Sequence, residues 1–302
     1  MDIKFYNRLT NKLEIEKVYG DKYVEWLYLS ESGKVAAHMV CKAMASKVYG
    51  ALQDSSLSKN KIVPFIKKFS IPMEDYLAED GRDSGSPYSS FNQFFIRKFK
   101  PGKRQFVENA NEMAAFSEAR YFGYSSIKDD EQVPVKGIYL KPKELLNNPT
   151  WENTFQDGPL LLARLCPVDY HRFHYPDNGV VLDDYRIPGL LHSVNPVALK
   201  AKPDILITNE RHVTILETEN FGKLAYIEVG AVCVGKIVQS KPLIKGQSFK
   251  RGDEKGYFLF GGSTVIVIGE KGKWAPSQDI LDYTQKGTET YLHLGMTVAK
   301  RG

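Results

Sequence analysis

Cysteine is scarce in this sequence, which holds only Cys41, Cys166 and Cys233 in 302 residues. Because these cysteines are odd in number and widely spaced, they favour neither a disulfide framework nor a cysteine metal site. We expect a reducing compartment, with Cys166 and Cys233 as buried apolar residues. Long apolar runs are also absent, and none approaches the roughly 18 apolar residues of a membrane-spanning helix. Since the first residues also lack the apolar core of a signal peptide, we expect neither a leader nor a transmembrane segment.

The composition excludes several classes of protein. Hydrophobic residues make up 42% of the chain, aromatic residues 12% and charged residues 25%. These proportions are typical of a soluble globular protein, and they exclude collagen-like, disordered and coiled-coil chains. At about 100–200 residues per domain, the length allows one large domain or two modest ones.

The positive charge is concentrated in the N-terminal third. The formal net charge is +5, and residues 1–110 hold 18 Lys and Arg against 13 Asp and Glu. Residues 33–72 contain seven lysines, and Asp54 is their only acidic residue. Within them, apolar and basic residues over Val35–Ala51 follow helical spacing, which predicts a basic amphipathic helix. Such a surface can bind anionic lipid, or it can be an ordinary solvated helix face packed on the protein.

The rest of the chain is of β type. Short segments rich in Val, Ile, Leu, Thr and Tyr are bounded by Gly, Pro, Asn or Asp, as strands are. The predicted strands are Pro159–Cys166, Val180–Ile187, Ile205–Glu217, Lys223–Ile237 and Thr264–Gly269. Before them, Glu79–Ser90 is predicted as an exposed loop leading into a short helix that begins near Ser89 or Ser90. No helical pattern alternates with the strands, which disfavours a doubly wound sheet. We predict an α+β fold, with a helical, basic N-terminal layer over residues 1–110 and a mostly antiparallel β core over residues 111–302.

Two histidines lie three residues apart in the segment Asp169–His174. Histidine exchanges protons near neutral pH, so His171 or His174 is a candidate general base. The pair could instead bind a metal, although no cysteine or suitably spaced carboxylate lies nearby, and no metal is expected. A structural histidine that bonds the backbone at a strand end also fits the pattern.

A serine follows two glycines at Gly261, Gly262 and Ser263, directly before a predicted strand. Because glycine has no Cβ, the peptide bond before Ser263 can adopt a strained conformation, which permits attack on the chain itself. The hydroxyl would need a histidine base oriented by a carboxylate. The same residues are also typical of a simple turn, and they do not match the Gly-x-Ser-x-Gly pattern of α/β-hydrolases.

Motif-like segments are spread over nearly the whole chain. They are Phe91–Lys98, Asp169–His174, Ser193–Pro196, Asn209–Arg211, Val229–Gly235, and Gly252–Gly256 followed by Gly262–Thr264. In this order they resemble the motifs of the bacterial phosphatidylserine decarboxylase proenzyme family, which include a Phe-Phe-x-Arg segment and an Asp-Tyr-His-Arg-x-His motif.

The resemblance implies a precursor that cuts itself between Gly262 and Ser263. Residue 263 then becomes an N-terminal pyruvoyl group, the covalent cofactor of the decarboxylase. The products would be a β chain of residues 1–262 and an α chain of residues 263–302, which stay together as a heterodimer because so short an α chain cannot form a core alone. In the family triad His174 is the base, and His171 is placed near the substrate.

The third member of the family triad is an aspartate in a Ser-Pro-x-Asp-Gly-like stretch. The matching stretch is Ala115–Arg120, which places Glu118 at that position. Glutamate keeps the carboxylate but is one methylene longer, and the Pro and Gly of the family stretch are missing. A shift on the order of 1 Å at a catalytic group can cost about 100-fold in rate. Slow or absent self-cleavage is therefore one expected outcome.

The resemblance also implies that the mature enzyme converts phosphatidylserine to phosphatidylethanolamine and carbon dioxide, as a peripheral protein on the cytoplasmic side of the cell membrane. The lysines of residues 33–72, with Phe65, Ile66 and Phe69, are the expected lipid contacts. Two alternatives stay open: a family member that binds phospholipid without cleaving itself, and a pyruvoyl decarboxylase of a soluble amino acid. No nucleic-acid partner is expected, because the basic residues form no recognised binding motif.

Overall fold

The computed structural model describes residues 3–16, 21–30, 32–33, 50, 52–83, 85–127, 140, 142–231, 236–261 and 263–302. Apart from Gly50, the helix predicted over Val35–Ala51 lies outside these residues, as do Cys41, Cys233 and Gly262. Within the described ranges, no helix is long and apolar enough to cross a membrane.

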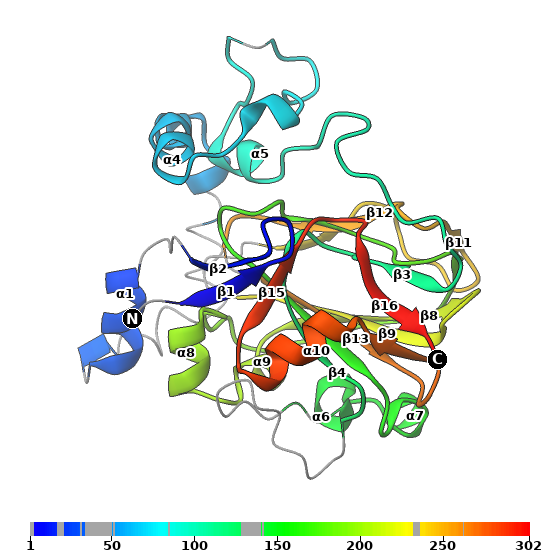
Figure 1. Cartoon of the computed structure of the whole chain (residues 1–302). Helices are drawn as coiled ribbons and strands as arrows, with labels where there is room; N and C mark the ends of the chain where they lie inside the picture. The colour runs from blue at the N-terminus through cyan, green and yellow to red at the C-terminus, as the bar shows by residue number, and fades with distance from the viewer. Residues whose placement is uncertain are drawn as a thin grey trace.

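One large sheet forms the centre of the molecule (Figure 1). Its strands are β1 (Lys4–Asn7), β2 (Lys12–Ile15), β4 (Ala119–Tyr124), β5 (Leu160–Leu165), β7 (Gly179–Ile187), β8 (Arg211–Thr218), β9 (Gly222–Val229), β11 (Ser248–Phe249), β13 (Ser263–Gly269) and β15 (Glu289–Leu292). They lie in the order β11-β7-β8-β9-β13-β5-β4-β15-β1-β2. All neighbours are antiparallel except β1 and β15, which are parallel.

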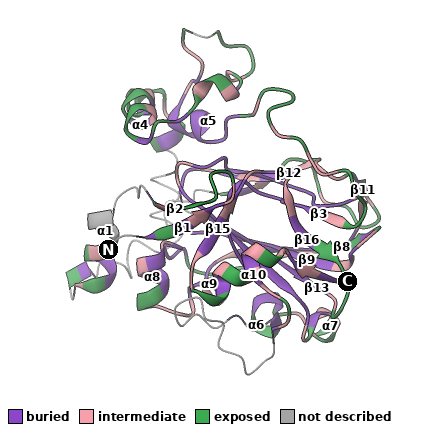
Figure 2. Cartoon of the chain, viewed as in Figure 1, coloured by how far each residue is buried: buried purple, intermediate pink, exposed green. Residues whose placement is uncertain are grey.

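The middle of this sheet is covered on both faces. Every residue of β5 and β13 is buried, and the purple strands in Figure 2 show this burial. Strands that are covered on both sides are apolar at almost every position rather than at alternate ones. The continuous runs of Leu, Val and Ile in β5 and β13 therefore explain why these two strands are central.

Two three-stranded sheets complete the β structure. Their strands are β3 (Glu112–Ala114), β6 (Arg172–His174), β10 (Ile237–Gln239), β12 (Glu254–Phe258), β14 (Trp274–Pro276) and β16 (Thr297–Arg301). The first sheet has the order β10-β12-β6, and the second has the order β14-β16-β3. The first sheet carries both the histidine motif and the strand that leads towards Ser263.

The helices are short. They are α1 (Asp21–Leu29), α4 (Ile62–Phe69), α5 (Phe91–Phe95), α6 (Pro142–Leu146), α7 (Pro149–Glu152), α8 (Pro196–Ala201), α9 (Ile205–Thr208) and α10 (Gln278–Gln285), with 3-10 turns η1 (Ser56–Lys61), η2 (Met73–Asp75) and η3 (Asn153–Phe155). The helix predicted near Ser89 or Ser90 is confirmed as α5. It begins after Ser90 because the Ser90 side chain accepts a hydrogen bond from the Gln93 N–H and so caps the helix.

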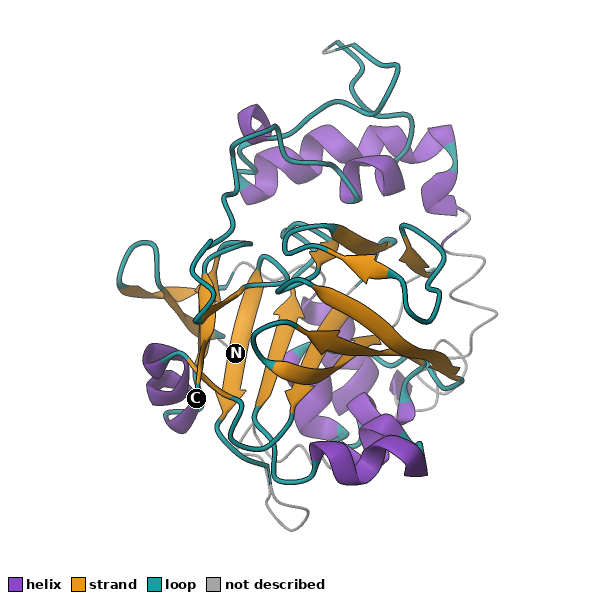
Figure 3. Cartoon of the chain, turned by 90° about the vertical axis from the view of Figure 1, so that its right-hand side faces the viewer, coloured by secondary structure: helices purple, strands orange, loops and turns teal. Residues whose placement is uncertain are grey.

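The segment with α4 and α5 has its own aromatic core and lies over one end of the β core (Figure 3). That core also includes Tyr170, Phe260 and Leu294 from the β part of the chain. Phe65 and Phe69 are buried in it, 5% and 8% exposed, so the expectation that they contact lipid is wrong. Their i, i+4 spacing serves packing against α5 instead.

Mixed helices and large antiparallel sheets confirm the α+β class. Two local predictions are wrong. Residues 4–15, assigned to the helical layer, form β1 and β2, because β1 pairs with the distant β15. The strand predicted over Ile205–Glu217 begins instead with the helix α9 and becomes a strand only at Arg211. A helical layer over the rest of residues 1–110 stays a prediction.

Candidate active site

The segment that leads into the histidine motif, residues 165–171, and the segment that leads to Ser263, residues 258–263, are hydrogen-bonded to each other at both ends. Ser263 pairs with Leu165 at the end of β5. At the other end, the Phe258 N–H donates to the His171 carbonyl oxygen at 3.0 Å. Residues 166–170 and 259–261 lie between these two pairings. The fold thus brings Ser263 and the histidine motif into one region of the molecule.

Ser263 is fully buried, and its Oγ has no hydrogen-bond partner among the described residues. A buried hydroxyl without a partner is costly, so its position calls for an explanation beyond packing. Just before it, Gly261 has φ +151°, which L side chains rarely adopt and glycine does readily. The Phe260 N–H donates to Asn92 Oδ1 at 2.9 Å, which ties this segment to α5. Gly262, the predicted cleavage residue, lies outside the described residues.

His174 has a partner at each ring nitrogen. Its Nδ1 lies 2.9 Å from the Gly252 carbonyl oxygen, and its Nε2 lies 3.3 Å from the Tyr170 hydroxyl. Burial lowers the pKa of His174 below its ordinary value, against the raising effect of the Gly252 carbonyl. The imidazole is therefore neutral near pH 7 and able to accept a proton.

His171 is enclosed by aromatic and backbone groups. Its ring packs against the tilted ring of Phe95, with centroids 3.8 Å apart, and its Nδ1 lies 3.1 Å from the Asp169 carbonyl oxygen. The Nε2 is buried without a hydrogen-bond partner in the described part of the chain. Burial lowers the pKa of His171 to about 3, and the nearby Arg97 charge adds to this effect. His171 is thus a neutral imidazole with one unused nitrogen.

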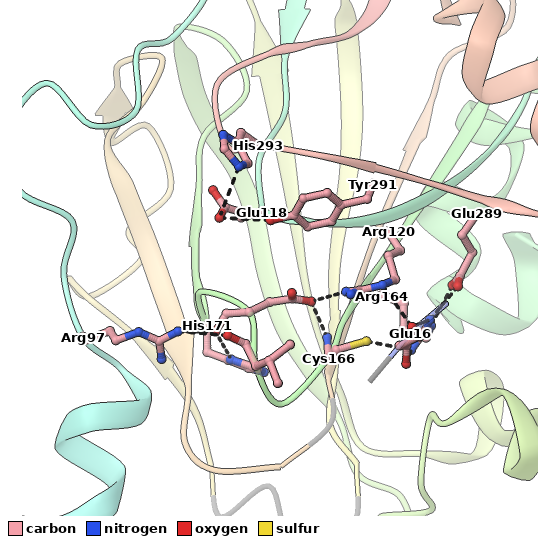
Figure 4. Close-up of polar contacts among 12 residues, drawn as sticks. Glu16, Arg97, Glu118, Arg120, Arg164, Cys166, His171, Glu289, Tyr291 and His293 are labelled. Carbon is pink, nitrogen blue, oxygen red and sulfur yellow. Dashed lines mark hydrogen bonds and ion pairs between the residues drawn. The ribbon is translucent and has the colours of Figure 1, made fainter. Parts of the chain in front are cut away.

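Glu118 does not contact either motif histidine within the described ranges. Its carboxylate accepts hydrogen bonds from Arg104 Nε at 2.5 Å and Nη2 at 2.8 Å. It also accepts one from the Tyr291 hydroxyl at 3.2 Å, as Figure 4 shows. His293 Nε2 lies 4.0 Å from the same carboxylate. The backbone just before Glu118 does lie next to His174, because the His174 N–H donates to the Phe116 carbonyl oxygen. The predicted histidine–carboxylate pair is therefore not in contact in the uncut chain.

Asp169 organises the turn that precedes the histidines, a role that sequence reasoning did not assign. Its carboxylate accepts from the Cys166 N–H and from Arg120 Nη1, both at 2.7 Å. Burial raises the pKa of Asp169 to about 6, although Arg120 acts in the opposite direction. The sequence gives one indication of this role, because Asp169 is the first residue of the Asp169–His174 motif. Cys166 is buried as predicted, with its sulfur 3.0 Å from Arg164 Nη1.

A buried network of charges continues from Asp169 through Arg120 across the sheet. Figure 4 shows its members Glu16, Arg120, Arg164 and Glu289. Glu16 lies between two arginines, 2.9 Å from Arg120 Nε and 2.6 Å from Arg164 Nη2. Arg164 also pairs with Glu289 at 2.5 Å. Burial alone would raise the pKa of Glu16, but the arginine charges outweigh it and lower the pKa to about 2. The network ties the N-terminal strands to the strands that hold the site.

An open cavity of about 900 Å³ adjoins this region. Phe106 and Arg251 are among its lining residues, and the Phe106 ring centroid lies 5.7 Å from that of His174.

In the described part of the chain, no three His, Cys, Asp or Glu side chains form a metal-ligating group.

Comparison with known proteins decides the family. The model of the phosphatidylserine decarboxylase family matches residues 91–300. The phosphatidylserine decarboxylase proenzyme of Clostridium tetani is 40% identical over 299 residues, covering 99% of this chain and 98% of the relative. The chain belongs to the phosphatidylserine decarboxylase family. Proenzymes of the same name from Desulfitobacterium hafniense (strain DCB-2) and Clostridium perfringens (strain ATCC 13124) are each 39% identical over 300 residues. Both cover 99% of this chain, and 98% and 100% of the relatives respectively.

The matched range begins at the first residue of α5 and contains every predicted site residue. The family resemblance inferred from the motifs is confirmed. The family and the proenzyme names of the relatives indicate a decarboxylase that matures from a precursor.

Proposed function

We propose that this chain is the precursor of a phosphatidylserine decarboxylase, which cuts itself at Gly262–Ser263 and then converts phosphatidylserine to phosphatidylethanolamine. The observation that carries the proposal is the fully buried, unpartnered Ser263 hydroxyl beside the histidine motif. A buried hydroxyl without a hydrogen bond is explained if it is a reactant.

Self-cleavage proceeds by acyl transfer and elimination. His174 accepts the Ser263 hydroxyl proton as Oγ attacks the Gly262 carbonyl carbon. The Gly262–Ser263 peptide bond breaks, and an ester bond to Oγ forms. Loss of the Cα proton of residue 263 then breaks its Cβ–Oγ bond and releases Gly262 as a carboxylate. Uptake of water and loss of ammonia leave a pyruvoyl group at residue 263.

The surroundings of Ser263 fit a pyruvoyl group. Neither Ser263 Oγ nor His171 Nε2 has a hydrogen-bond partner among the described residues, so a small carbonyl group displaces no existing hydrogen bond there. The bound group supplies an electron sink for the electrons left when carbon dioxide departs. His171 lies on the substrate side, and His174 delivers a proton to the substrate carbon.

The two proposed chains stay together because the cut falls at the start of a central strand. β13 lies between β9 and β5 in the large sheet, and β15 joins β4 to β1. The α chain of residues 263–302 therefore cannot leave without opening the sheet. This arrangement supports the proposed heterodimer, in a catalytic domain that we place at residues 111–302 with β1 and β2 added to its large sheet.

Glu118 acts in this proposal as the carboxylate that orients His174, and its contacts favour a second candidate function. Its carboxylate is bound by Arg104 and Tyr291 rather than by a motif histidine. If it stays there, the chain does not cut itself and only binds phospholipid. The two functions differ in one step, the movement of Glu118 to His174 Nδ1, where its carboxylate takes the place of the Gly252 carbonyl oxygen as the acceptor.

The membrane surface is proposed on the side of η1 and α4. Lys59, Lys67 and Lys68 lie there beside two strongly exposed apolar side chains, Leu57 at 81% and Val63 at 73% exposure. Cationic side chains next to exposed apolar ones favour the headgroup level of an anionic bilayer. The mature protein would bind peripherally, on the cytoplasmic face of the cell membrane.

Vesicle co-sedimentation at low salt tests this surface. We expect Leu57→Ser/Val63→Ser to lower binding to vesicles that contain phosphatidylserine. The matched control is Ile244→Ser, because Ile244 is 63% exposed but lies between β10 and β11, outside α4 and η1. Equal binding by all three proteins would contradict the assignment of the surface.

The activity is tested by incubating the purified protein with phosphatidylserine vesicles and measuring phosphatidylethanolamine by mass spectrometry. We expect product from the parent protein and none from Ser263→Ala. Decarboxylation of free serine without product from vesicles would favour the soluble amino acid alternative. An uncut chain that binds vesicles but makes no product would favour the non-cleaving function.

A further inference from the structure

The proton-accepting nitrogen of His174 can be identified from its contacts. A carbonyl oxygen only accepts hydrogen bonds, so the contact with Gly252 requires the proton of the neutral imidazole to sit on Nδ1. The Nε2 then carries the lone pair. Its partner is the Tyr170 hydroxyl at 3.3 Å, which must donate to it.

Tyr170 is built into the site by packing on both sides. Its ring lies nearly parallel to the His174 ring, at a centroid distance of 5.9 Å and an angle of 23°. The Tyr170 ring also packs against Phe99, with the two ring centroids 4.4 Å apart. Tyr170 is 3% exposed and belongs to the aromatic core that also contains Phe260. Its ring therefore has little room to turn, and its hydroxyl is directed at Nε2.

The chemistry of Tyr170 suits a permanent donor. Burial raises the pKa of Tyr170 well above its ordinary value, so the hydroxyl keeps its proton over the whole working range of pH. In the proposed self-cleavage the same Nε2 accepts the Ser263 proton, so the Tyr170 hydroxyl lies at the nitrogen that the reaction needs.

We propose that Tyr170 is a positioning residue for His174: its hydroxyl bonds Nε2, keeps the imidazole neutral with the proton on Nδ1, and yields this nitrogen to Ser263 when cleavage begins. The proposal rests on the proposed role of His174 in self-cleavage. It adds a residue between the aromatic core and the base, and it agrees with a Ser263 Oγ that has no partner among the described residues before the reaction.

Other charged groups also face His174 and must be kept constant in a test. Glu254 and Asp253 raise its pKa, and Arg172 lowers it. Since Tyr170→Phe removes one oxygen and no charge, these three contributions remain. A hydrogen bond that favours the neutral imidazole lowers its pKa, so its loss raises the pKa of His174 by about half a unit to one unit.

The experiment is NMR of histidine-labelled protein in a Ser263→Ala background, which keeps the chain uncut. The His174 signal is assigned by its loss in His174→Gln. We expect nitrogen shifts that place the proton on Nδ1. We also expect the titration midpoint of His174 to rise in Tyr170→Phe but not in Tyr175→Phe. Tyr175 is the matched control, since it follows His174 directly and its ring stacks on Phe249 instead.

Three results would each overturn the proposal. One is a proton on His174 Nε2 instead of Nδ1, and measuring this in the Ser263→Ala protein requires no further variant. The second is an unchanged midpoint in Tyr170→Phe, and the third is an equal shift in Tyr175→Phe. Self-cleavage of the parent protein is followed in parallel on gels. Its absence would count against the proposed function and leave the NMR result intact as a test of the contact.

Discussion

The buried ion pair between Glu228 and Lys255 supports a quantitative prediction. Both side chains are completely buried, and Lys255 Nζ lies 2.5 Å from Glu228 Oε1. Lys255 also donates to Gln239 Oε1 at 3.1 Å. Glu228 is on β9 opposite Val265, and Lys255 is on β12, which leads to Ser263. The pair therefore fastens the small sheet with the histidine motif onto the large sheet.

The magnitude follows from the burial of both charges. Removing one partner leaves a buried charge without compensation, which typically costs about 3–5 kcal/mol. Replacing both by apolar residues of similar size is often neutral or stabilising. We expect Lys255→Met and Glu228→Leu each to lower the free energy of unfolding by about 4 kcal/mol. The double variant should unfold close to the parent protein.

The assay is urea unfolding followed by circular dichroism, in a Ser263→Ala background so that one uncut species is present. Lys271→Met is the matched control, because the Lys271–Asp157 pair is exposed and should contribute at most about 1 kcal/mol. If Lys255→Met costs no more than Lys271→Met, the reasoning is refuted. It is equally refuted if the double variant loses as much as the two single variants together.

Two further predictions concern carboxylates. The pKa of Glu16 is about 2 in the folded chain against an ordinary value of 4.5, so its stabilising effect is complete above pH 4.5 and disappears as the pH falls towards 2. Between pH 7 and pH 3 the parent protein should therefore lose about 2 kcal/mol of stability that Glu16→Gln does not lose, as measured by urea titrations; a parallel pH dependence in both proteins would argue against it. Glu118→Gln should slow self-cleavage on the order of 100-fold or more, as measured by the appearance of the C-terminal fragment. Glu112→Gln, which affects only a pair with the exposed Lys300, should not. Cleavage of Glu118→Gln at the parent rate would exclude Glu118 from the triad.

Short stretches of sequence were sufficient to predict those candidate residues that belong to a recognisable local pattern. The Asp169–His174 motif and the glycines before Ser263 are short patterns, and the fold places them together. The strands around Leu160–Leu165 were equally clear, since an uninterrupted apolar run between turn residues favours a buried strand. A run as short as Ile205–Thr208 fits a helix or a strand equally well, and there the prediction of a strand was wrong.

Features that depend on contacts between residues far apart in the sequence could not be predicted from local patterns. β1 is a strand because it lies parallel to β15, at the other end of the chain. The partner of Glu118 is Arg104, which no motif connects with it. Likewise, the lysine-rich segment did not reveal which apolar side chains face outwards. Phe65 is inside and Val63 is outside because α5 covers one side of α4.

The central claim is that the chain makes its own pyruvoyl group from Ser263, and intact mass spectrometry of the purified protein tests it most directly. The account predicts two chains, residues 1–262 and residues 263–302. The short chain should be lighter, by the mass of one ammonia, than the same peptide with an N-terminal serine. Ser263→Ala should give a single chain of full length. A single uncut chain from both proteins, even after long incubation, would contradict the account.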